Sequence, residues 1–391
     1  MKKTIYLDNG ASTKTDPLVV EEMLPYFTEL YGNPSSIYSF SEKPREAIAK
    51  VRRIIASRIN ANSEEIIFIS GGSEADNLAL RGTAYAARKG DNKNHIITSK
   101  IEHPAILNTC KALEKDGFEV TYLDVDSDGF IDLKELESAI NENTFLVSIM
   151  LANNEIGTIQ DIEAIGQICK DKGVLFHTDA VQAFTKVKID VKKMNIDLMS
   201  LASHKIHGPK GVGALYIKKG VNLVHLMTGG HQEMDIRAGT ENVPGIVGFG
   251  KAVELASENH IIYMAGLRDK MAADIEKIIP DIKLNGPKGN KRLCNNVNFA
   301  FRYIEGEGIV LHLDEEGICV STASACSSQS LQPSHVLLAI GLKPESAHGC
   351  IRFTLSRFTT EDEINYTVKE LKRIIRQLRE MSPLAPYDNE E

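Results

Sequence analysis

The stretch Ile66-Ile67-Phe68-Ile69-Ser70-Gly71-Gly72-Ser73 passes from four apolar residues through two glycines into a helical pattern over residues 73–89. Further short apolar runs alternate with helical patterns along the next hundred residues (runs at 95–98, 118–123, 145–151 and 174–177; helical patterns at 105–115 and 161–172). Runs of this length, rich in Val and Ile and separated by helices, are typical of a mostly parallel sheet covered on both faces. We therefore expect an α/β fold that binds its ligand at the carboxyl ends of the strands.

The pattern changes after about residue 255. A long helical pattern over residues 263–279 leads into shorter elements, and an amphipathic pattern over residues 360–381 predicts a last helix. A chain of 391 residues is long enough for two or three domains. We predict a large domain over residues 15–255 and a smaller α+β domain formed by residues 1–14 and 256–391.

The composition excludes several classes of protein. The chain has 45 Lys and Arg against 53 Asp and Glu, a formal charge of −8, and no long basic run, which argues against a nucleic-acid partner. Its first residues lack the apolar run of a signal peptide, and no stretch is apolar for long enough to span a membrane. The six cysteines form no CxxC pair, which is typical of reduced thiols in a cytoplasmic protein.

Three strand ends carry residues suited to chemistry. Gly72 and Ser73 could bind an anion at a helix start, Asp179 follows an apolar run, and Lys205 lies between the apolar residues 198–202 and a Gly-Pro turn. Each feature alone has an ordinary explanation: a glycine turn, a helix cap or a surface lysine. Together they supply what pyridoxal phosphate requires, namely an anion site, a carboxylate for the ring nitrogen and a lysine that forms a Schiff base.

With these motifs the chain resembles the pyridoxal-phosphate-dependent cysteine desulfurases of the iron–sulphur-cluster-assembly and nitrogen-fixation type. The resemblance runs from Tyr6 to Leu384 and rests on a series of motifs in the family's order: Gly32-Asn33-Pro34-Ser35-Ser36, Glu102-His103, Asn153-Asn154-Glu155-Ile156-Gly157, His204-Lys205 with Gly208-Pro209-Lys210-Gly211, Arg237-Ala238-Gly239-Thr240 and Ser324-Ala325-Cys326-Ser327-Ser328. It implies a type I, aspartate-aminotransferase-like fold, a homodimer, and conversion of L-cysteine to L-alanine.

The resemblance also implies roles for single residues. Lys205 would hold the cofactor and remove the substrate Cα proton, Asp179 would pair with the ring nitrogen, and His103 would stack on the ring and relay protons. The expected cofactor-binding residues are Gly72, Ser73, His103, Asn154, Asp179, Gln182, Ala202, Ser203, His204, Lys205 and, from the partner subunit, Thr240. The expected substrate-binding residues are Asn33, Asn154 and Arg352, with Arg352 binding the carboxylate.

Cys326 is the expected sulphur acceptor. Its thiolate would attack the sulphur of the substrate, and the enzyme would carry a persulphide that it passes to a sulphur-acceptor protein, such as an iron–sulphur scaffold. A lone cysteine is more often buried and inert, but the polar, non-periodic residues around Cys326 argue against burial. The segment belongs to the predicted smaller domain.

Several positions depart from the pattern of the family. Ala202 stands where a phosphate-binding serine is expected, although Ser203 is adjacent and could substitute. Four glycines are replaced, by His231, Asp235, Ala323 and Ser356. A side chain at such a position costs about 1 kcal/mol or more if the backbone needs a positive φ.

One motif points elsewhere. Acidic residues and a glycine at the spacing of a calcium-binding EF-hand loop occur together at Asp124, Asp126, Asp128, Gly129 and Glu135. The alternation over residues 118–123 predicts a strand before the loop, where an EF-hand needs a helix. We therefore interpret the loop as an acidic turn and expect no metal site.

Three functions stay open at this point. The first is cysteine desulfuration. The second is another reaction on the same cofactor, by a selenocysteine lyase or an aminotransferase, although an aminotransferase has no use for the cysteine segment. The third is a non-catalytic binding or scaffold protein, which only the lost glycines suggest. Release of sulphide from cysteine, compared with a Cys326→Ala variant, distinguishes them.

Overall fold

A seven-stranded sheet forms the larger part of the protein. The structure, a computed structural model, describes residues 4–322 and 333–384. The strand order is β2 (Ile66–Ile69), β8 (Gly213–Ile217), β7 (Leu198–Ala202), β6 (Leu175–Asp179), β5 (Thr144–Ser148), β3 (His95–Ser99) and β4 (Glu119–Leu123). Only β8 runs antiparallel to its two neighbours. The predicted α/β fold with a mostly parallel sheet is confirmed.

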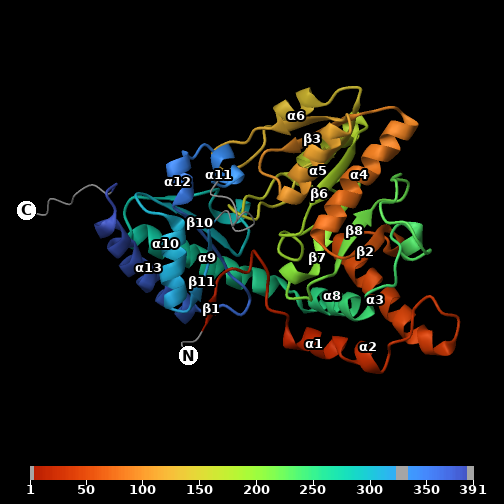
Figure 1. Cartoon of the computed structure of the whole chain (residues 1–391), viewed down its shortest axis with the longest axis horizontal. Helices are drawn as coiled ribbons and strands as arrows, with labels where there is room; N and C mark the ends of the chain where they lie inside the picture. The colour runs from red at the N-terminus through yellow and green to blue at the C-terminus, as the bar shows by residue number, and fades with distance from the viewer. Residues whose placement is uncertain (1–3, 323–332, 385–391) are drawn as a thin grey trace, which may run out of the picture.

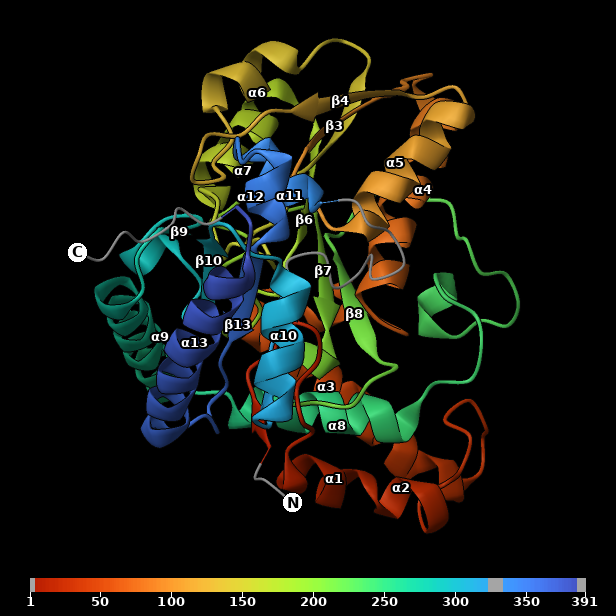
Figure 2. The same cartoon turned by 60° about the vertical axis from the view of Figure 1, so that its left-hand side comes forward.

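Helices cover both faces of this sheet. The apolar sides of α4 (Gly72–Gly90) and α5 (Pro104–Lys115) form one core with the strands. On the opposite face a second core includes α3 (Glu42–Ile59), α7 (Ile162–Lys172) and α8 (Val243–Leu255). Figure 2 shows α4 and α5 together on one side of the strands and α6 (Leu133–Ala139) and α7 on the other. The predicted helices at 73–89, 105–115 and 161–172 are thereby confirmed.

A smaller α+β part has a core of its own. Its sheet has the order β12 (Ser321–Thr322), β13 (Cys350–Thr354), β10 (Asn296–Phe301) and β9 (Ile282–Leu284). Three long helices pack against it: α9 (Glu258–Ile278), α10 (Gly306–Glu315) and α13 (Glu361–Met381). The two predicted helices of this region are confirmed, and α9 begins earlier than predicted because Ser257 caps it through its side chain. The boundary near residue 255 stays a prediction.

The N-terminal segment, residues 5–16, runs from the smaller part to the larger one (Figure 1). Its strand β1 (Ile5–Tyr6) pairs in parallel with β11 (Ile318–Cys319), and Ile5 and Leu7 belong to the smaller core. Further along, the backbone N–H of Thr13 donates to His204 O at 3.0 Å. The segment then enters α1 (Pro17–Met23) and α2 (Pro25–Thr28), which lie beside α8. It therefore contacts both parts of the molecule.

The acidic loop after β4 is a tight turn. Strand β4 precedes it, as the alternation predicted, and Val125 pairs with Ile131 across the turn. Asp126 accepts hydrogen bonds from the backbone of Asp128 and Phe130, and Asp132 caps α6. Within the ranges that the structure describes, no group of three or more His, Cys, Asp or Glu side chains could hold a metal ion. Asp126 and Asp132 thus serve local backbone and capping contacts, and Asp124 pairs with Lys100.

None of the helices in the described residues is both long and apolar enough to cross a bilayer.

The replaced glycines differ in their backbone geometry. Asp235 has φ 66° and follows Glu233 and Met234, which also have positive φ, whereas His231 and Ser356 are not among the residues in this region of φ/ψ space. The buried Glu233 carboxylate holds the turn through two hydrogen bonds from Arg52, at 2.7 and 2.9 Å. Of the three replacements that the structure describes, Asp235 alone carries the left-handed backbone for which glycine is favoured. Ala323 lies outside the described residues.

Substitution of Asp235 by glycine should stabilise the protein. An L side chain in the left-handed region costs about 1 kcal/mol or more, and Asp235→Gly removes this cost. The midpoint of thermal unfolding should therefore rise. Asp91→Gly is the matched control, because Asp91 is also exposed but has φ −98°. The control should lower the midpoint, since glycine adds only chain entropy there. A lower midpoint for Asp235→Gly would contradict strain at this turn.

Candidate active site

The first predicted site residues lie where β2 passes into α4. Helix α4 begins at Gly72, and no side chain among the described residues caps it, so its first N–H groups are available to an anion. A Cβ on Gly72 would meet Val181 Cγ2 at 2.8 Å, which explains the glycine. Glu74 in the first turn is paired with Arg237 at 3.0 Å, so its charge is offset. The residues fit an anion site.

Asp179 lies at the carboxyl end of β6, as predicted. Its side chain is buried and accepts a hydrogen bond from the backbone of Val181 at 2.9 Å. Burial raises the pKa of Asp179, while the nearby His103 and Lys205 lower it. Gln182 lies on the turn that follows, and its side chain donates to Gly10 O at 2.9 Å. A buried carboxylate between two nitrogen bases can hold its charge.

A polar network lies behind Asp179 in the interior. Burial and the Asp179 carboxylate raise the pKa of Asp76 well above its usual range. The ring of His177 contacts Ser148 Oγ at 2.8 Å and Ser200 Oγ at 3.0 Å, and burial lowers the pKa of His177 to about 3. The neutral imidazole offers Asp76 no charge, whereas His103 and Lys205 lower the pKa of Asp179, so the arrangement favours the proton on Asp76 and the negative charge on Asp179.

Lys205 faces a turn of the N-terminal segment. Its Nζ donates to Gly10 O and Ala11 O, each at 2.7 Å. The lysine lies in a short helical turn directly after β7. Strand β7 pairs with β6, at whose end Asp179 lies opposite Ser200, and the Lys205 amine lowers the pKa of both Asp179 and His103. Lys205, Asp179 and His103, far apart in sequence, therefore meet at one edge of the sheet.

His103 is the N-cap of α5. Its Nδ1 accepts a hydrogen bond from the backbone N–H of Ala105 at 3.1 Å, which leaves the proton of the neutral ring on Nε2. Burial lowers the pKa of His103, and the Asp179 carboxylate partly offsets this. The preceding residue, Glu102, is buried, and burial raises its pKa to about 8. A neutral His103 can accept and release a proton near pH 7.

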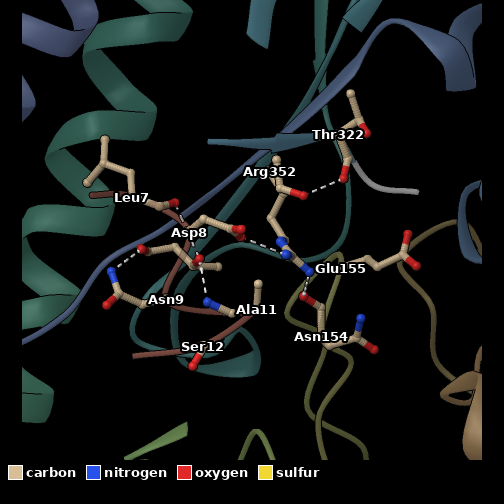
Figure 3. A network of polar contacts seen from close by, with 12 residues as sticks. Leu7, Asp8, Asn9, Ala11, Ser12, Asn154, Glu155, Thr322 and Arg352 are labelled. Carbon is tan, nitrogen blue, oxygen red and sulfur yellow. Dashed lines mark hydrogen bonds and ion pairs between the residues drawn. The ribbon is translucent and has the colours of Figure 1, made fainter. Parts of the chain in front are cut away.

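Arg352 enters the site from the smaller part, on β13 (Figure 3). Its Nη2 pairs with Asp8 Oδ1 at 2.9 Å, and its Nη1 donates to Asn154 O at 3.0 Å. Asn154 thus contacts the arginine through its backbone carbonyl, and the residue is half-buried. Glu155 beside it is buried, and its pKa rises to about 7 through burial. The structure brings Arg352 and Asn154 together, as expected for a substrate-binding pair.

Three other predicted residues, 202–204, directly precede Lys205. Ala202 ends β7 and is buried, and Ser203 Oγ is buried without a hydrogen-bond partner among the described residues. A Cβ on Gly208 would lie 1.9 Å from that oxygen, so Ser203 points toward Gly208. His204 contacts Ser12 Oγ at 3.3 Å.

Two expected residues lie on the surface. Asn33 is exposed, and its side chain accepts a hydrogen bond from Ser35 N at 2.9 Å. Thr240 is exposed and lines a hollow with Ser70 and Arg237. Neither takes part in the cluster around Lys205 within this chain, and the expected role of Thr240 in the partner subunit stays a prediction.

The structure describes five of the six cysteines. Cys326 lies outside the described residues. Burial raises the pKa of Cys110, Cys169 and Cys350 to about 12, so these thiols are protonated and inert at neutral pH. Cys294 is also buried, and Cys319 is half-buried.

Sequence reasoning missed the N-terminal turn and the network behind Asp179. Asp8 follows the buried Leu7 just after β1, and a charge in that position was a signal that could have been used. Asp76 lies in the predicted helix on the side of Ala75 and Ala79, an apolar face where a carboxylate is unusual. The carbonyls of Gly10 and Ala11 gave no signal, because only folding places them beside Lys205.

Comparison with known proteins places this site in a family. The model of the aminotransferase class-V family matches residues 5–367. A cysteine desulfurase IscS of Clostridium botulinum is 56% identical over 388 residues, 98% of this chain and 97% of that protein. A cysteine desulfurase IscS of Methanosarcina thermophila is 52% identical over 389 residues, 99% of this chain and 95% of that protein.

Solved structures agree with this likeness. A NifS-like protein superposes with a TM-score of 0.90 at 39% identity, over 96% of this chain and 100% of that one. The structure of SspA in complex with cysteine gives a TM-score of 0.82 at 40% identity, over 91% of this chain and 100% of that one. The chain therefore belongs to the aminotransferase class-V family and, within it, to the cysteine desulfurases.

Proposed function

We propose that this enzyme binds pyridoxal phosphate on Lys205, converts L-cysteine to L-alanine, and takes up the sulphur of the substrate on Cys326. The observation that carries the proposal is the meeting of Lys205, Asp179 and His103 at the carboxyl ends of β6 and β7 and the start of α5. A nucleophilic amine, a buried anion and a neutral base are the groups that this cofactor needs from a protein.

The residues present fit this cofactor. The uncapped start of α4 at Gly72 and Ser73 suits its phosphate, and His204 would contribute a ring N–H. The buried Asp179 carboxylate suits a protonated ring nitrogen, and Gln182 and Asn154 offer amide groups at the same edge of the sheet. Ala202 offers no hydrogen-bonding side chain, and Ser203 points toward Gly208, so the phosphate would depend on α4, His204 and the partner's Thr240.

The bound cofactor supplies an electron sink for the Cα of the substrate. The residues of the chain perform the remaining tasks. Arg352 binds the carboxylate and so orients the Cα–H bond toward Lys205. The Lys205 amine accepts the Cα proton, and Asp179 preserves the positive charge on the ring nitrogen. His103 presents its Nε2 to the same space and holds or moves a proton there.

Transfer of sulphur requires a second nucleophile. The Cys326 thiolate attacks the sulphur of the substrate, a sulphur–sulphur bond forms, and the bond between that sulphur and Cβ breaks with its electron pair left on the carbon side. Protonation of Cβ then yields alanine, and Cys326 keeps a persulphide. Among the cysteines, the three with a pKa of about 12 lack the thiolate that this step needs.

We also propose the oligomeric state of the enzyme, the class of its sulphur acceptor and its cellular compartment. We expect a homodimer, because apolar side chains of residues 24–38 are widely exposed, among them Phe27 at 58% and Ile37 at 101%. The persulphide would pass to a sulphur-acceptor protein of iron–sulphur-cluster assembly or another thiol acceptor. The cysteines are well separated in the sequence, and those in the described residues are free thiols, which suits the reducing cytoplasm.

Reduction of the holoenzyme with borohydride should fix the cofactor on Lys205. Peptide mapping by mass spectrometry should find the pyridoxyl group there, and Lys205→Ala should abolish both the label and the activity. Lys186 is the matched control, because burial lowers its pKa to about 8 and makes it the other candidate nucleophile nearby. Lys186→Arg should keep the label on Lys205. A label on Lys186, or none, would contradict the proposal.

Incubation with L-cysteine should add one sulphur atom to the peptide that contains Cys326. Mass spectrometry without reductant detects the persulphide, and Cys326→Ala should lose both the adduct and sulphide release while it keeps the cofactor. Cys319→Ala is the control, since Cys319 is the described cysteine with the most exposed setting. Its behaviour should match the wild type. An unchanged rate for Cys326→Ala would exclude Cys326 as the acceptor.

The acid limb of the pH profile should report His103. Burial disfavours the imidazolium, so the pKa is lowered and His103 stays neutral below its ordinary value of about 6.5. We expect kcat/KM to fall only below that pH. His103→Gln should remove this limb and lower kcat by about 10²-fold or more. His312→Gln, a control in α10, should keep the wild-type profile. An acid limb unchanged by His103→Gln would assign it to another group.

A further inference from the structure

The guanidinium of Arg352 has a donor left over. Its Nη1 and Nη2 are engaged by Asn154 O and Asp8 Oδ1, but its Nε is buried and has no hydrogen-bond partner among the described residues. The whole residue is 3% exposed. An unpaired buried N–H on a cation is costly, so the arrangement lacks an acceptor that a carboxylate can supply.

Asp8 is fixed by the strand that also carries Arg352. Asn9 Nδ2 donates to Thr354 O at 2.8 Å, and Gly10 N donates to Thr354 Oγ1 at 2.7 Å. Leu7 O, just before Asp8, accepts from Thr354 N at 2.6 Å. The residues on both sides of Asp8 are thus bound to Thr354 in β13, two positions from Arg352. The Asp8 carboxylate has a defined place relative to the guanidinium, and the ion pair is largely screened from water.

The same turn faces Lys205. Gly10 O accepts from Lys205 Nζ, and a Cβ on Gly10 would lie 3.2 Å from Arg352 Cζ. Residue 10 therefore has to be small for Arg352 to lie against the turn. Residues 8–11 thus contact Arg352 on one side and the amine of Lys205 on the other.

We propose that Asp8 is a positioning residue that orients Arg352 for the α-carboxylate of the substrate. This inference rests on the proposed function only in taking Arg352 as the carboxylate site. Asp8 binds one edge of the guanidinium and directs the remaining N–H groups toward the ligand. Its loss would leave Arg352 bound by one neutral carbonyl, free to adopt other rotamers, and would weaken carboxylate binding specifically.

Equilibrium binding to the holoenzyme tests this without turnover. Isothermal titration calorimetry compares L-alanine, which has the carboxylate, with L-alaninamide, which lacks its charge. Asp8→Ala should weaken L-alanine binding by about tenfold, the value of one hydrogen bond to a charged group, and leave L-alaninamide within about twofold. In steady state with L-cysteine, KM should rise while kcat changes by less than about threefold.

Asp8→Asn keeps an acceptor but removes the charge. It should weaken L-alanine binding by less than Asp8→Ala does, and again spare L-alaninamide. Asp16→Asn is the matched control, because Asp16 lies on the same segment and pairs with Arg357, another arginine just after β13. The control should lower the thermal midpoint and leave the affinity for L-alanine unchanged.

Three results would overturn the inference: equal losses for both ligands, no loss for L-alanine, or tighter L-alanine binding by Asp8→Asn, which would make Asp8 only a repelling charge. If Asp8→Ala does not fold, the binding of the two ligands to Asp8→Asn alone tests the inference. Failure of the proposed function gives a different result, because the wild type would then release no sulphide from L-cysteine. The difference in affinity between L-alanine and L-alaninamide would still test the role of Asp8.

Discussion

Residues 8–11 hold the two sides of the active site at a fixed separation. Their backbone and side chains bind Thr354 in the smaller part, and their carbonyls accept from Lys205 in the larger part. A substrate that must reach an amine and a guanidinium at once depends on this separation, because a small error in placement removes much of the benefit of orientation. The tight packing of Gly10 against Arg352 shows how little room the turn leaves.

Burial of charge is the second constraint. Asp179, Asp76 and Glu102 are buried in the interior, and the Asp179 carboxylate raises the pKa of both Asp76 and Glu102. Three buried anions would be far too costly, and only Asp179 has the nearby His103 and Lys205 to lower its pKa, so the arrangement favours the charge on Asp179. The neutral His177 with its two serines satisfies polar groups without adding charge. The interior thus concentrates one negative charge at the sheet edge.

The departures from the family pattern are accommodated in different ways. Ser356 makes local hydrogen bonds, with its Oγ accepting from Phe358 N at 3.1 Å, and its backbone does not need glycine. Asp235 does occupy a left-handed backbone, held by the bidentate contact of Glu233 with Arg52. Ala202 removes a hydroxyl near the expected phosphate. The Asp235 replacement costs stability and Ala202 lacks a cofactor contact. The expected Lys205, Asp179, His103 and Arg352 are all present in the chain.

The sequence alone determined the mostly parallel sheet and the helices around it, because apolar periodicity is a local signal. Its strand-end motifs predicted Lys205 and Asp179 as site residues, and its resemblance to a known family predicted His103 and Arg352. It also predicted, through the alternation before Asp124, the strand that precedes the acidic loop. Only the tertiary structure revealed that Asp8 pairs with Arg352, that Asp76 lies behind Asp179, and that Gly10 faces Lys205. These contacts join residues up to 344 positions apart, and no local pattern records them; they exist because two separately packed cores bring the segments together.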